Sequence, residues 1–360
     1  MAAGTIMRID HQVLRTFTRD VFIRLGVPDG DATVASDVLV HADVLGIDSH
    51  GVARLAGHPG YVPGLKSGII NPVVRPRIVT ETASTVLLDG NAGLGGVVST
   101  HGMNLAIAKA RESGVGAVTV TNSHHFGIAS HYAMMALPHG MIGVAMTNAA
   151  PQVVPTNGRH ALLGTNPISV AVPAAQERPF ILDMATSVVA AGKVEIAQRT
   201  GKPIPDGWLV DKDGIPTVDP QALWNGGALL PLGSKPEISS HKGYGLAVAV
   251  DVLCGVLSGA GYSSILDPVS WTAGHFFLAL RVDAFRPLAG FLTMMDSMIQ
   301  TLNAAEPVPG ADRIFVHGEK ELDAERERLR QGIPLHPAVI DSLRGLSTEF
   351  GVPFPVVSDG

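Results

Sequence analysis

The chain has 360 residues and a formal net charge of −6, and it is 46% hydrophobic but only 16% charged. This length and composition are typical of a globular protein with two or three domains or one large domain, and they exclude an intrinsically disordered chain. The negative net charge provides no basic surface that would attract nucleic acid or anionic lipid. We therefore expect neither nucleic acid nor a membrane as a partner.

The single cysteine, Cys254, excludes a disulfide within the chain and favours a reducing compartment. The N-terminal residues lack the apolar run of a signal peptide. The longest apolar segment, residues 245–261, is interrupted by Asp251 and by glycines, so it is not expected to span a bilayer. These features predict a cytoplasmic protein.

The first seventy residues have a helical pattern. Asp10 can cap a helix that runs to about Leu25, and residues 26–30 break it. A second helix is predicted over residues 31–44, where apolar side chains recur at helical spacing. Pro-Gly pairs after residue 58 then indicate a passage rich in loops.

From about Pro76 the pattern alternates between strands and helices. Strands are predicted at 85–89, 115–121, 141–146, 168–172, 180–182 and 275–280. Helices are predicted at 96–113, 129–137, 188–198 and 243–258. Residues 200–240 are rich in proline, glycine and aspartate, with turn sequences such as Asp211-Lys212-Asp213-Gly214, and they predict a long surface excursion.

A helical pattern returns from about Leu288 and includes the charged segment 319–330. Helical ends around an alternating middle predict an α/β protein whose two termini pack together. We expect residues 1–75 and 285–360 to form one helical domain. Residues 76–284 would form the α/β domain, which carries the excursion at 200–240.

Two histidine motifs are the strongest indications of chemistry. His124-His125-Phe126-Gly127 follows a β-branched run and precedes a predicted helix, which is a common place for active sites in α/β proteins. Ser49-His50-Gly51 is followed by Arg54, four residues after its histidine. Imidazoles and a positioned arginine suit proton transfer to a substrate that carries a carboxylate. We expect packing roles for His124 and for His131.

No Gly-x-Gly-x-x-Gly fingerprint and no Walker A loop occur in the chain. The glycine-rich segment 90–96 is expected to be an ordinary turn from a strand to a helix. A nicotinamide cofactor would instead need backbone amides at helix starts and the side chains of residues such as Thr165, Asn166 and Lys242. Asp183 ends a predicted strand, where its carboxylate can cap the next helix or orient a histidine, and capping is the favoured interpretation.

A metal site built from His41, Asp43 and His50 is conceivable, but no spacing typical of metal ligands supports it. We therefore expect no bound metal.

Five blocks together resemble one known family, the malate/L-lactate dehydrogenases that are unrelated to the Rossmann-fold enzymes. Its members include sulfolactate and ureidoglycolate dehydrogenases, diketogulonate reductase and piperideine-2-carboxylate reductase. The similarity covers about residues 8 to 330. In chain order the blocks are Ser49-His50-Gly51 with Arg54, Asn122–Gly127, Gly164-Thr165-Asn166-Pro167, Asp183-Met184-Ala185-Thr186 and Lys242-Gly243-Tyr244-Gly245.

The resemblance implies a non-Rossmann NAD(P)-binding domain with a mostly antiparallel sheet, which would be residues 76–284. It also implies a homodimer and an NAD(P)-dependent oxidoreductase. The substrate would be a 2-hydroxy acid, or its 2-oxo partner, of the malate or lactate kind. The choice between NAD and NADP stays open, because no arginine pair marks a 2′-phosphate site and no acidic residue is clearly placed for a ribose hydroxyl.

The resemblance also implies roles for individual residues. His125 matches the general acid/base and Arg54 the residue that clamps the substrate carboxylate. Ser49, His50 and Asp183 match a proton relay proposed for the imine-reducing members. The residues that match cofactor contacts are Phe126, Gly127, Ile128, Ala129, Ala149, Thr165, Asn166, Asp183, Met184, Ala185, Lys242, Gly318 and Glu319.

One departure from the family pattern concerns the substrate site. Family members usually carry a tyrosine four residues after the arginine, where this chain has His58, and Tyr61 follows what looks like a short insertion. Either residue could contact the substrate. This departure keeps open a non-catalytic relative that only binds a dinucleotide or another ligand. A reductase of cyclic imine 2-carboxylates also stays open, because Ser49, His50 and Asp183 are all present.

Overall fold

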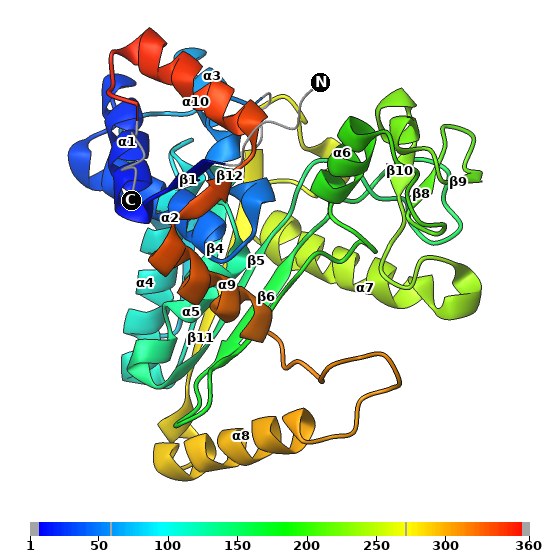
Figure 1. The fold of residues 1–360 in the computed structure, drawn as a ribbon. Helices are drawn as coiled ribbons and strands as arrows, with labels where there is room; N and C mark the ends of the chain where they lie inside the picture. The colour runs from blue at the N-terminus through cyan, green and yellow to red at the C-terminus, as the bar shows by residue number, and fades with distance from the viewer. Residues whose placement is uncertain (1–6, 58–59, 271, 355–360) are drawn as a thin grey trace.

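The centre of the molecule is a twisted sheet, shown with the rest of the chain in Figure 1. The computed structural model describes residues 7–57, 60–270 and 272–354. Within them the sheet has seven strands in the order β2-β3-β4-β11-β5-β6-β7. The strands are β2 (Arg77–Glu81), β3 (Thr85–Asp89), β4 (Val115–His124), β5 (Met141–Thr147), β6 (Ile168–Val172), β7 (Phe180–Met184) and β11 (Thr272–Arg281).

Only β3 and β4 run parallel among these neighbours, and they are joined through helix α4 (Gly95–Ser113). The other neighbouring pairs of this sheet are antiparallel. The predicted α/β class with a mostly antiparallel sheet is therefore confirmed, and the topology differs from the mostly parallel sheet of the Rossmann fold.

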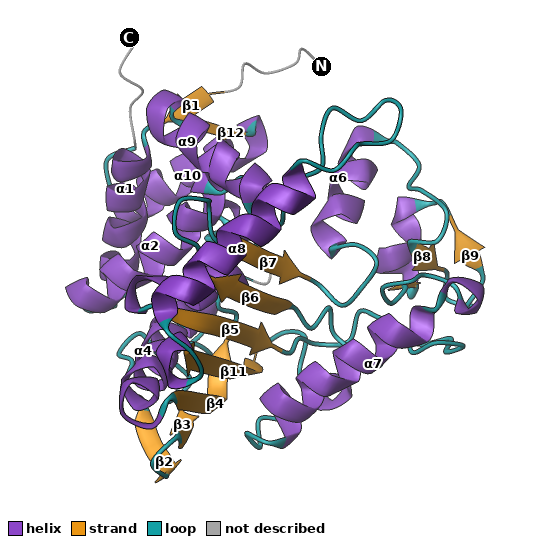
Figure 2. Cartoon of the chain, turned by 90° about the horizontal axis from the view of Figure 1, so that it is seen from below, coloured by secondary structure: helices purple, strands orange, loops and turns teal. Residues whose placement is uncertain are grey.

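Helices cover both faces of the sheet (Figures 1 and 2). On one face, α4 and α5 (Ala129–Met134) bury apolar side chains such as Met103 and Tyr132 against Phe277 of β11. The opposite face is covered by the π-helix Asp251–Val256, which continues from α7 (Ser240–Val250) and packs against β4, β5 and β11. These layers hold the ends of β4 and β7 in place, where the site residues lie.

The two ends of the described chain meet in a short sheet. Strand β1 (Met7–Ile9) pairs antiparallel with β12 (Ile333–Leu335). A shared apolar core contains Leu14, Leu39 and Leu343, which come from three different helices. The helices that supply this core include α1 (His11–Arg24), α2 (Asp29–Val44), α3 (Tyr61–Lys66) and α10 (Pro337–Phe350), and α9 (Glu319–Gln331) leads into β12.

The predicted cap of the first helix is confirmed. One carboxylate oxygen of Asp10 accepts the backbone N–H groups of Gln12 and Val13 at 2.8 and 3.1 Å. These are donors that the first turn of a helix leaves without an internal partner.

Helix α8 (Leu288–Asn303) lies at the opposite end of the molecule from the paired termini (Figure 1). The carboxylate of Asp296 accepts backbone N–H groups of Ala175, Gln176 and Glu177 in the β6–β7 turn. Apolar side chains of α8 remain exposed, with Met294 at 59%.

The excursion at 200–240 is ordered around its own small apolar core, which includes Leu209 and Leu229. It contains the short strands β8 (Leu209–Val210), β9 (Pro216–Thr217) and β10 (Ala228–Leu229), and α6 (Ala191–Thr200) precedes it.

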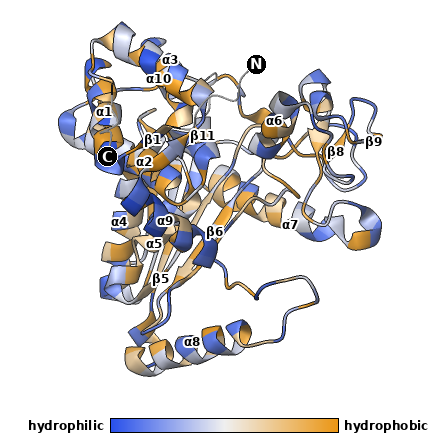
Figure 3. Ribbon diagram, in the orientation of Figure 1, coloured by the Kyte–Doolittle hydropathy of each residue, from blue (hydrophilic) through white to orange (hydrophobic). Residues whose placement is uncertain are grey.

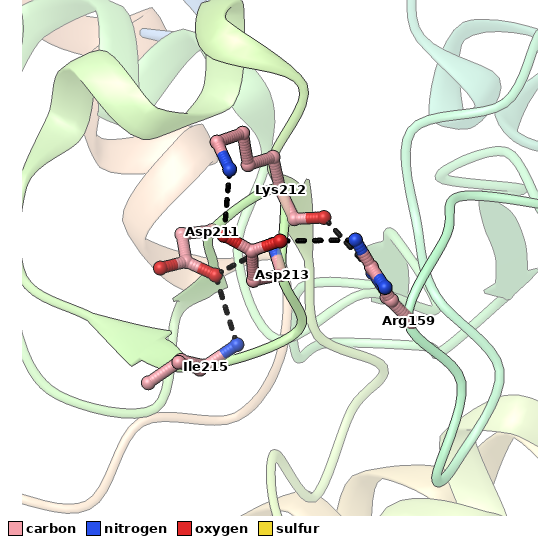
Figure 4. Close-up of polar contacts among 5 residues, drawn as sticks. All are labelled: Arg159, Asp211, Lys212, Asp213 and Ile215. Atoms are coloured by element: carbon pink, nitrogen blue, oxygen red, sulfur yellow. Dashed lines mark hydrogen bonds and ion pairs between the residues drawn. The ribbon is translucent and has the colours of Figure 1, made fainter.

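The turn predicted at 211–214 is present (Figure 4). Asp211 accepts the N–H groups of Asp213 and Ile215 at 2.8 and 2.9 Å, and Arg159 holds the Asp213 carboxylate at 2.9 Å.

Several predicted boundaries were wrong. The helix predicted from Val188 begins only at Ala191, because the Val188 N–H binds the carbonyl of Leu230 and keeps this segment extended. The helix predicted over 129–137 ends at Met134, shortly before Pro138. Strand β4 runs three residues further than predicted, to His124, because β11 pairs with it up to that residue.

Strands β1, β2, β8, β9, β10 and β12 were missed, and β1 and β12 depend on pairing between distant parts of the chain. Figure 3 shows that α7 is one of the more apolar helices, whereas α9 is largely hydrophilic. Within the described ranges, none of the helices combines the length and the apolar character that crossing a membrane requires.

Candidate active site

His125 lies in the short connection between β4 and α5. The preceding His124 is buried at the end of the strand, and its Nδ1 lies 3.1 Å from the Gly93 carbonyl oxygen, which agrees with a packing role. Gly127 turns the chain with a φ of +82°, and a Cβ there would lie 2.7 Å from a methyl group of Val38. The strand end and this glycine together aim the His125 side chain away from the sheet core.

The start of α4 supports the same connection. Gly95 packs so closely that an added Cβ would overlap the carbonyl oxygens of His124 and His125. The glycine-rich segment 90–96 is therefore a turn from strand to helix, as predicted. Because Gly95 has no side chain, the start of α4 can approach the backbone that carries His125.

We predict that Gly95→Ala lowers both stability and activity. The new methyl group must displace the His124–His125 backbone, and overpacking of this kind reduces the free energy of unfolding by about 1–3 kcal/mol. Thermal unfolding and kcat measure the two effects. Gly345→Ala is the matched control, because no described atom lies within 4 Å of its added Cβ. Equal melting temperatures and equal kcat values for the two variants would contradict the prediction.

The Ser49–Arg54 motif forms two short 3₁₀ turns, Asp48–His50 and Val52–Arg54. The buried Asp43 carboxylate of α2 accepts the Val52 N–H at 2.8 Å and thereby holds the second turn. Arg54 donates from Nε to the Ser49 carbonyl at 2.7 Å. That bond anchors the guanidinium, whose two terminal nitrogens have the flat geometry that pairs with a carboxylate.

The fold brings the two histidine motifs together. The His50 and His125 rings stack with centroids 5.5 Å apart and planes inclined by 20°. Ser49 Oγ lies 2.8 Å from His50 Nδ1. The arginine motif and the histidine loop, predicted separately from sequence, therefore share one site.

Burial keeps both imidazoles neutral. Desolvation, reinforced by the Arg54 charge, lowers the pKa of His50 to about 4. The pKa of His125 is lowered well below its ordinary value of 6.5, first by desolvation and then by the nearby groups of His50, Arg54 and His275. A neutral His125 is a base, ready to accept a proton.

Tyr61 and His275 support His125 and its loop in ways that the motif pattern did not reveal. The Tyr61 hydroxyl lies 2.8 Å from His125 Nδ1, whereas His58 lies outside the described residues. His275 is buried between Thr147 and Ser123, and its ring stacks on Phe126 with centroids 4.8 Å apart. A histidine in an otherwise apolar strand was the only sequence signal for His275.

Asp183, at the end of β7, accepts the backbone N–H of Ser130 at 2.8 Å. The prediction that it caps the next helix along the chain was wrong, because β7 ends beside the first turn of α5. Burial raises its pKa to about 6 against the opposing effect of Ser130. Ser49 and His50 are in direct contact, whereas the Asp183 carboxylate binds the backbone of α5.

The Thr165-Asn166 block supports backbone geometry. Asn166, buried with a φ of +37°, accepts the Ala149 N–H at 3.1 Å and donates to the Ala247 carbonyl at 2.9 Å. The Thr165 carbonyl accepts the backbone N–H of Thr186. Met184 and Ala185 lead from β7 towards Thr186. The Asn166 side-chain amide is therefore engaged in hydrogen bonds within the protein, and one of them holds the Ala149 backbone in position.

The remaining cofactor candidates lie at helix starts. Lys242 is exposed in the first turn of α7. Gly318 precedes α9 with a φ of +96°, and a Cβ there would lie 2.9 Å from Ile181. The Glu319 carboxylate accepts the Val316 N–H and pairs with Arg313 at 2.9 Å. This side chain therefore stabilises the loop that precedes α9.

A cavity of about 230 Å³ lies between α2, α5, β7 and the start of α9. It brings together Asp183 and Gly318, two of the predicted cofactor contacts, beside Ser130, the residue after Ala129. Its lining residues are Leu45, Ile47, Ser130, Met134, Ile181, Asp183, Phe315, Val316, His317, Gly318, Lys320 and Glu321.

Comparison with known proteins identifies the class of this fold and site. Residues 9–344 match the family model described as malate/L-lactate dehydrogenase. The chain is 43% identical to a malate dehydrogenase of Pyrococcus horikoshii over 350 residues, which is 96% of each chain. It therefore belongs to the malate/L-lactate dehydrogenase family, as the ordered motifs predicted.

Solved structures agree with this assignment. A malate dehydrogenase from Entamoeba histolytica superposes with a TM-score of 0.94 at 36% identity, covering 98% of this chain and all (100%) of that one. A delta1-piperideine-2-carboxylate reductase from Pseudomonas syringae gives a TM-score of 0.83 at 30% identity, covering 94% of this chain and 99% of that chain.

Proposed function

We propose that this protein is an NAD(P)-dependent dehydrogenase of 2-hydroxy carboxylic acids, of the malate or lactate kind. The observation that carries the proposal is the stack of His125 on His50, because the His50 motif also holds Arg54. The proposed acid/base group and the proposed carboxylate clamp thus lie in one site. Family membership and the similarity to malate dehydrogenases support the same activity.

The residues of the chain would act in a simple order. Arg54 would hold the substrate carboxylate through two parallel hydrogen bonds and so orient C2. In oxidation, neutral His125 would take the hydroxyl proton as hydride leaves C2; in reduction, protonated His125 would return it. The nicotinamide, when bound, supplies the hydride acceptor or donor.

The cavity beside Asp183 fits part of a dinucleotide. Apolar walls such as Met134 and Ile181 suit the face of a ring, while the Asp183 carboxylate can accept ribose hydroxyl groups. We propose that Asp183, Gly318 and the segment from Phe126 to Ala129 hold the cofactor. Ala149, Thr165, Met184, Ala185 and Lys242 stay in this proposal as further contacts. Lys320 and Glu321 both line the cavity, so NAD and NADP are proposed equally.

The direct test is a substrate panel. Pyruvate, oxaloacetate and a cyclic imine 2-carboxylate are each mixed with NADH and with NADPH, and the absorbance of the reduced nicotinamide is followed. We expect it to fall with at least one 2-oxo acid. Binding of a dinucleotide without any turnover would favour a non-catalytic relative and contradict the proposal.

Reduction of a cyclic imine is the second candidate function. The similarity to the piperideine-2-carboxylate reductase structure favours it, as does the close contact of Ser49 with His50. In the panel, faster turnover of the imine than of either 2-oxo acid would identify this activity as the principal one.

The lowered pKa of His125 predicts how activity depends on pH. Because the neutral base persists below the ordinary value of 6.5, kcat/KM for oxidation should stay level from pH 8 down to about that value and fall only below it. Reduction needs the protonated ring, so its kcat/KM should decline as pH rises through the lowered pKa. A fall in oxidation centred above pH 7 would contradict this assignment.

We also propose the division into a helical domain, 1–75 with 285–360, and an α/β domain, 76–284. The pairing of β1 with β12 and their shared apolar core support it. Helix α8 is an exception, since Asp296 binds the β6–β7 turn of the other unit. Limited proteolysis would test the boundaries.

A homodimer is the proposed assembly. Exposed apolar side chains on α8, including Phe285 just before it, Met294, Met298 and Leu302, support burial against a second copy. Sedimentation equilibrium should give twice the mass of the chain. A monomer at micromolar concentration would contradict the proposal.

The lone cysteine, Cys254, supports the proposed cytoplasmic location.

A further inference from the structure

Tyr61 occupies a well-determined position beside the proposed acid/base. It is the first residue of α3 and is only 3% exposed. Its ring packs edge-on against Phe22, with centroids 6.2 Å apart, and edge-on against His125 at 5.9 Å. The phenol is therefore built into the helical core, and its hydroxyl faces the site.

The hydroxyl of Tyr61 reaches two atoms of the same histidine. Its oxygen lies 2.8 Å from His125 Nδ1 and 3.2 Å from the His125 carbonyl oxygen. The carbonyl can only accept a hydrogen bond, so its contact with Tyr61 requires the single phenolic proton. When that proton is directed to the carbonyl, the phenolic oxygen accepts a hydrogen bond from Nδ1, which then carries a proton. Burial raises the pKa of Tyr61 above its ordinary value, so the phenol keeps its proton near neutral pH.

A competing donor lies on the other side of the ring nitrogen. The Gly127 N–H points to His125 Nδ1 at 3.3 Å and would favour an unprotonated Nδ1. In that tautomer the proton sits on Nε2, and Nε2 cannot accept a second proton from a hydroxyl group. The Gly127 contact favours the tautomer protonated at Nε2. The shorter Tyr61 contact, with the phenolic proton directed to the carbonyl, favours the tautomer that leaves Nε2 basic.

We propose that Tyr61 is a positioning residue that holds neutral His125 as its Nδ1–H tautomer, so that Nε2 exchanges the proton with substrate. The proposal rests on the proposed function. In oxidation, Nε2 would take the substrate O–H proton, and a bound nicotinamide would supply the acceptor for the C2 hydride. The Nδ1 proton and the Tyr61 proton stay where they are, so the same hydrogen bonds serve both charge states of the ring.

The test compares Tyr61→Phe with Tyr132→Phe. The Tyr132 hydroxyl is also buried in this region, but it donates to the carbonyl of Phe126 and not to His125. For Tyr61→Phe we expect kcat of oxidation to fall roughly 10²-fold, with KM changed less than about threefold. For Tyr132→Phe we expect a lower melting temperature with an unchanged pH profile of kcat. Equal kcat values in wild type and Tyr61→Phe would overturn the proposal.

Nitrogen-15 NMR of the histidine side chains gives a readout that does not depend on turnover. The His125 signals are assigned as those lost in His125→Gln. Wild type should show a protonated Nδ1, and Tyr61→Phe should show a protonated Nε2. A protonated Nε2 in wild type would overturn the inference even if Tyr61→Phe fails to fold. If no 2-oxo acid or imine is reduced, the proposed function fails, while this spectrum still decides the role of Tyr61.

Discussion

Replacing His125 with alanine should lower kcat by about 10²- to 10⁴-fold, the usual contribution of a positioned general acid/base. The variant loses the group that takes the hydroxyl proton, while its neighbours His50 and Tyr61 remain. Because the side chain packs against His50 and Tyr61 and not in the apolar core of the sheet, the fold should survive. Steady-state kinetics and the circular dichroism spectrum measure the two outcomes.

His131→Gln is the matched control for this variant. His131 is a half-buried histidine, and its Nδ1 lies 2.9 Å from His41 Nδ1, so its loss should affect stability and not proton transfer. The melting temperature should therefore fall while kcat stays within about threefold of wild type. A loss of less than tenfold in His125→Ala would count against the acid/base role.

Replacing Arg54 with glutamine should lower kcat/KM by about 10²- to 10⁴-fold. Hydrogen bonds to charged groups contribute about 1.5–3 kcal/mol each, and the clamp would lose two of them. The variant also loses the bond from Nε to the Ser49 carbonyl, which anchors the turn. KM should rise because substrate binding itself is weakened, and kcat should fall because C2 is less well oriented.

Arg54→Lys separates charge from geometry at this position. Lysine keeps the positive charge but cannot form the two parallel hydrogen bonds, so we expect an intermediate loss. A substrate analogue without the carboxylate gives a second control, since it should discriminate little between wild type and Arg54→Gln. Full activity in Arg54→Gln would show that another group holds the carboxylate.

The local motifs could be predicted from sequence, because neighbouring residues determine them. The end of a β-branched strand followed by His124-His125-Phe126-Gly127 predicted a histidine at a strand end. The spacing of His50 and Arg54 predicted a positioned cation. Both features depend on a few consecutive residues, and both are present in the fold.

Contacts between distant segments could not be read in the same way. Tyr61 and His125 are 64 residues apart, and nothing in the hydrophobic pattern links α3 to β4. Asp183 follows β7, but its partner is Ser130 of α5, because strand order and not chain order decides which helix lies beside a strand end. Strand β12 is short and contains Pro334, so its pairing with β1 left no periodic signal.

A structure of the protein with NADH and oxamate, an unreactive mimic of a 2-oxo acid, tests the central claim most directly. We predict that the oxamate carboxylate lies within hydrogen-bond distance of both terminal nitrogens of Arg54, with its carbonyl oxygen at His125 Nε2 and C2 facing the nicotinamide. Oxamate bound elsewhere, or a nicotinamide ring placed away from His125, would contradict the account.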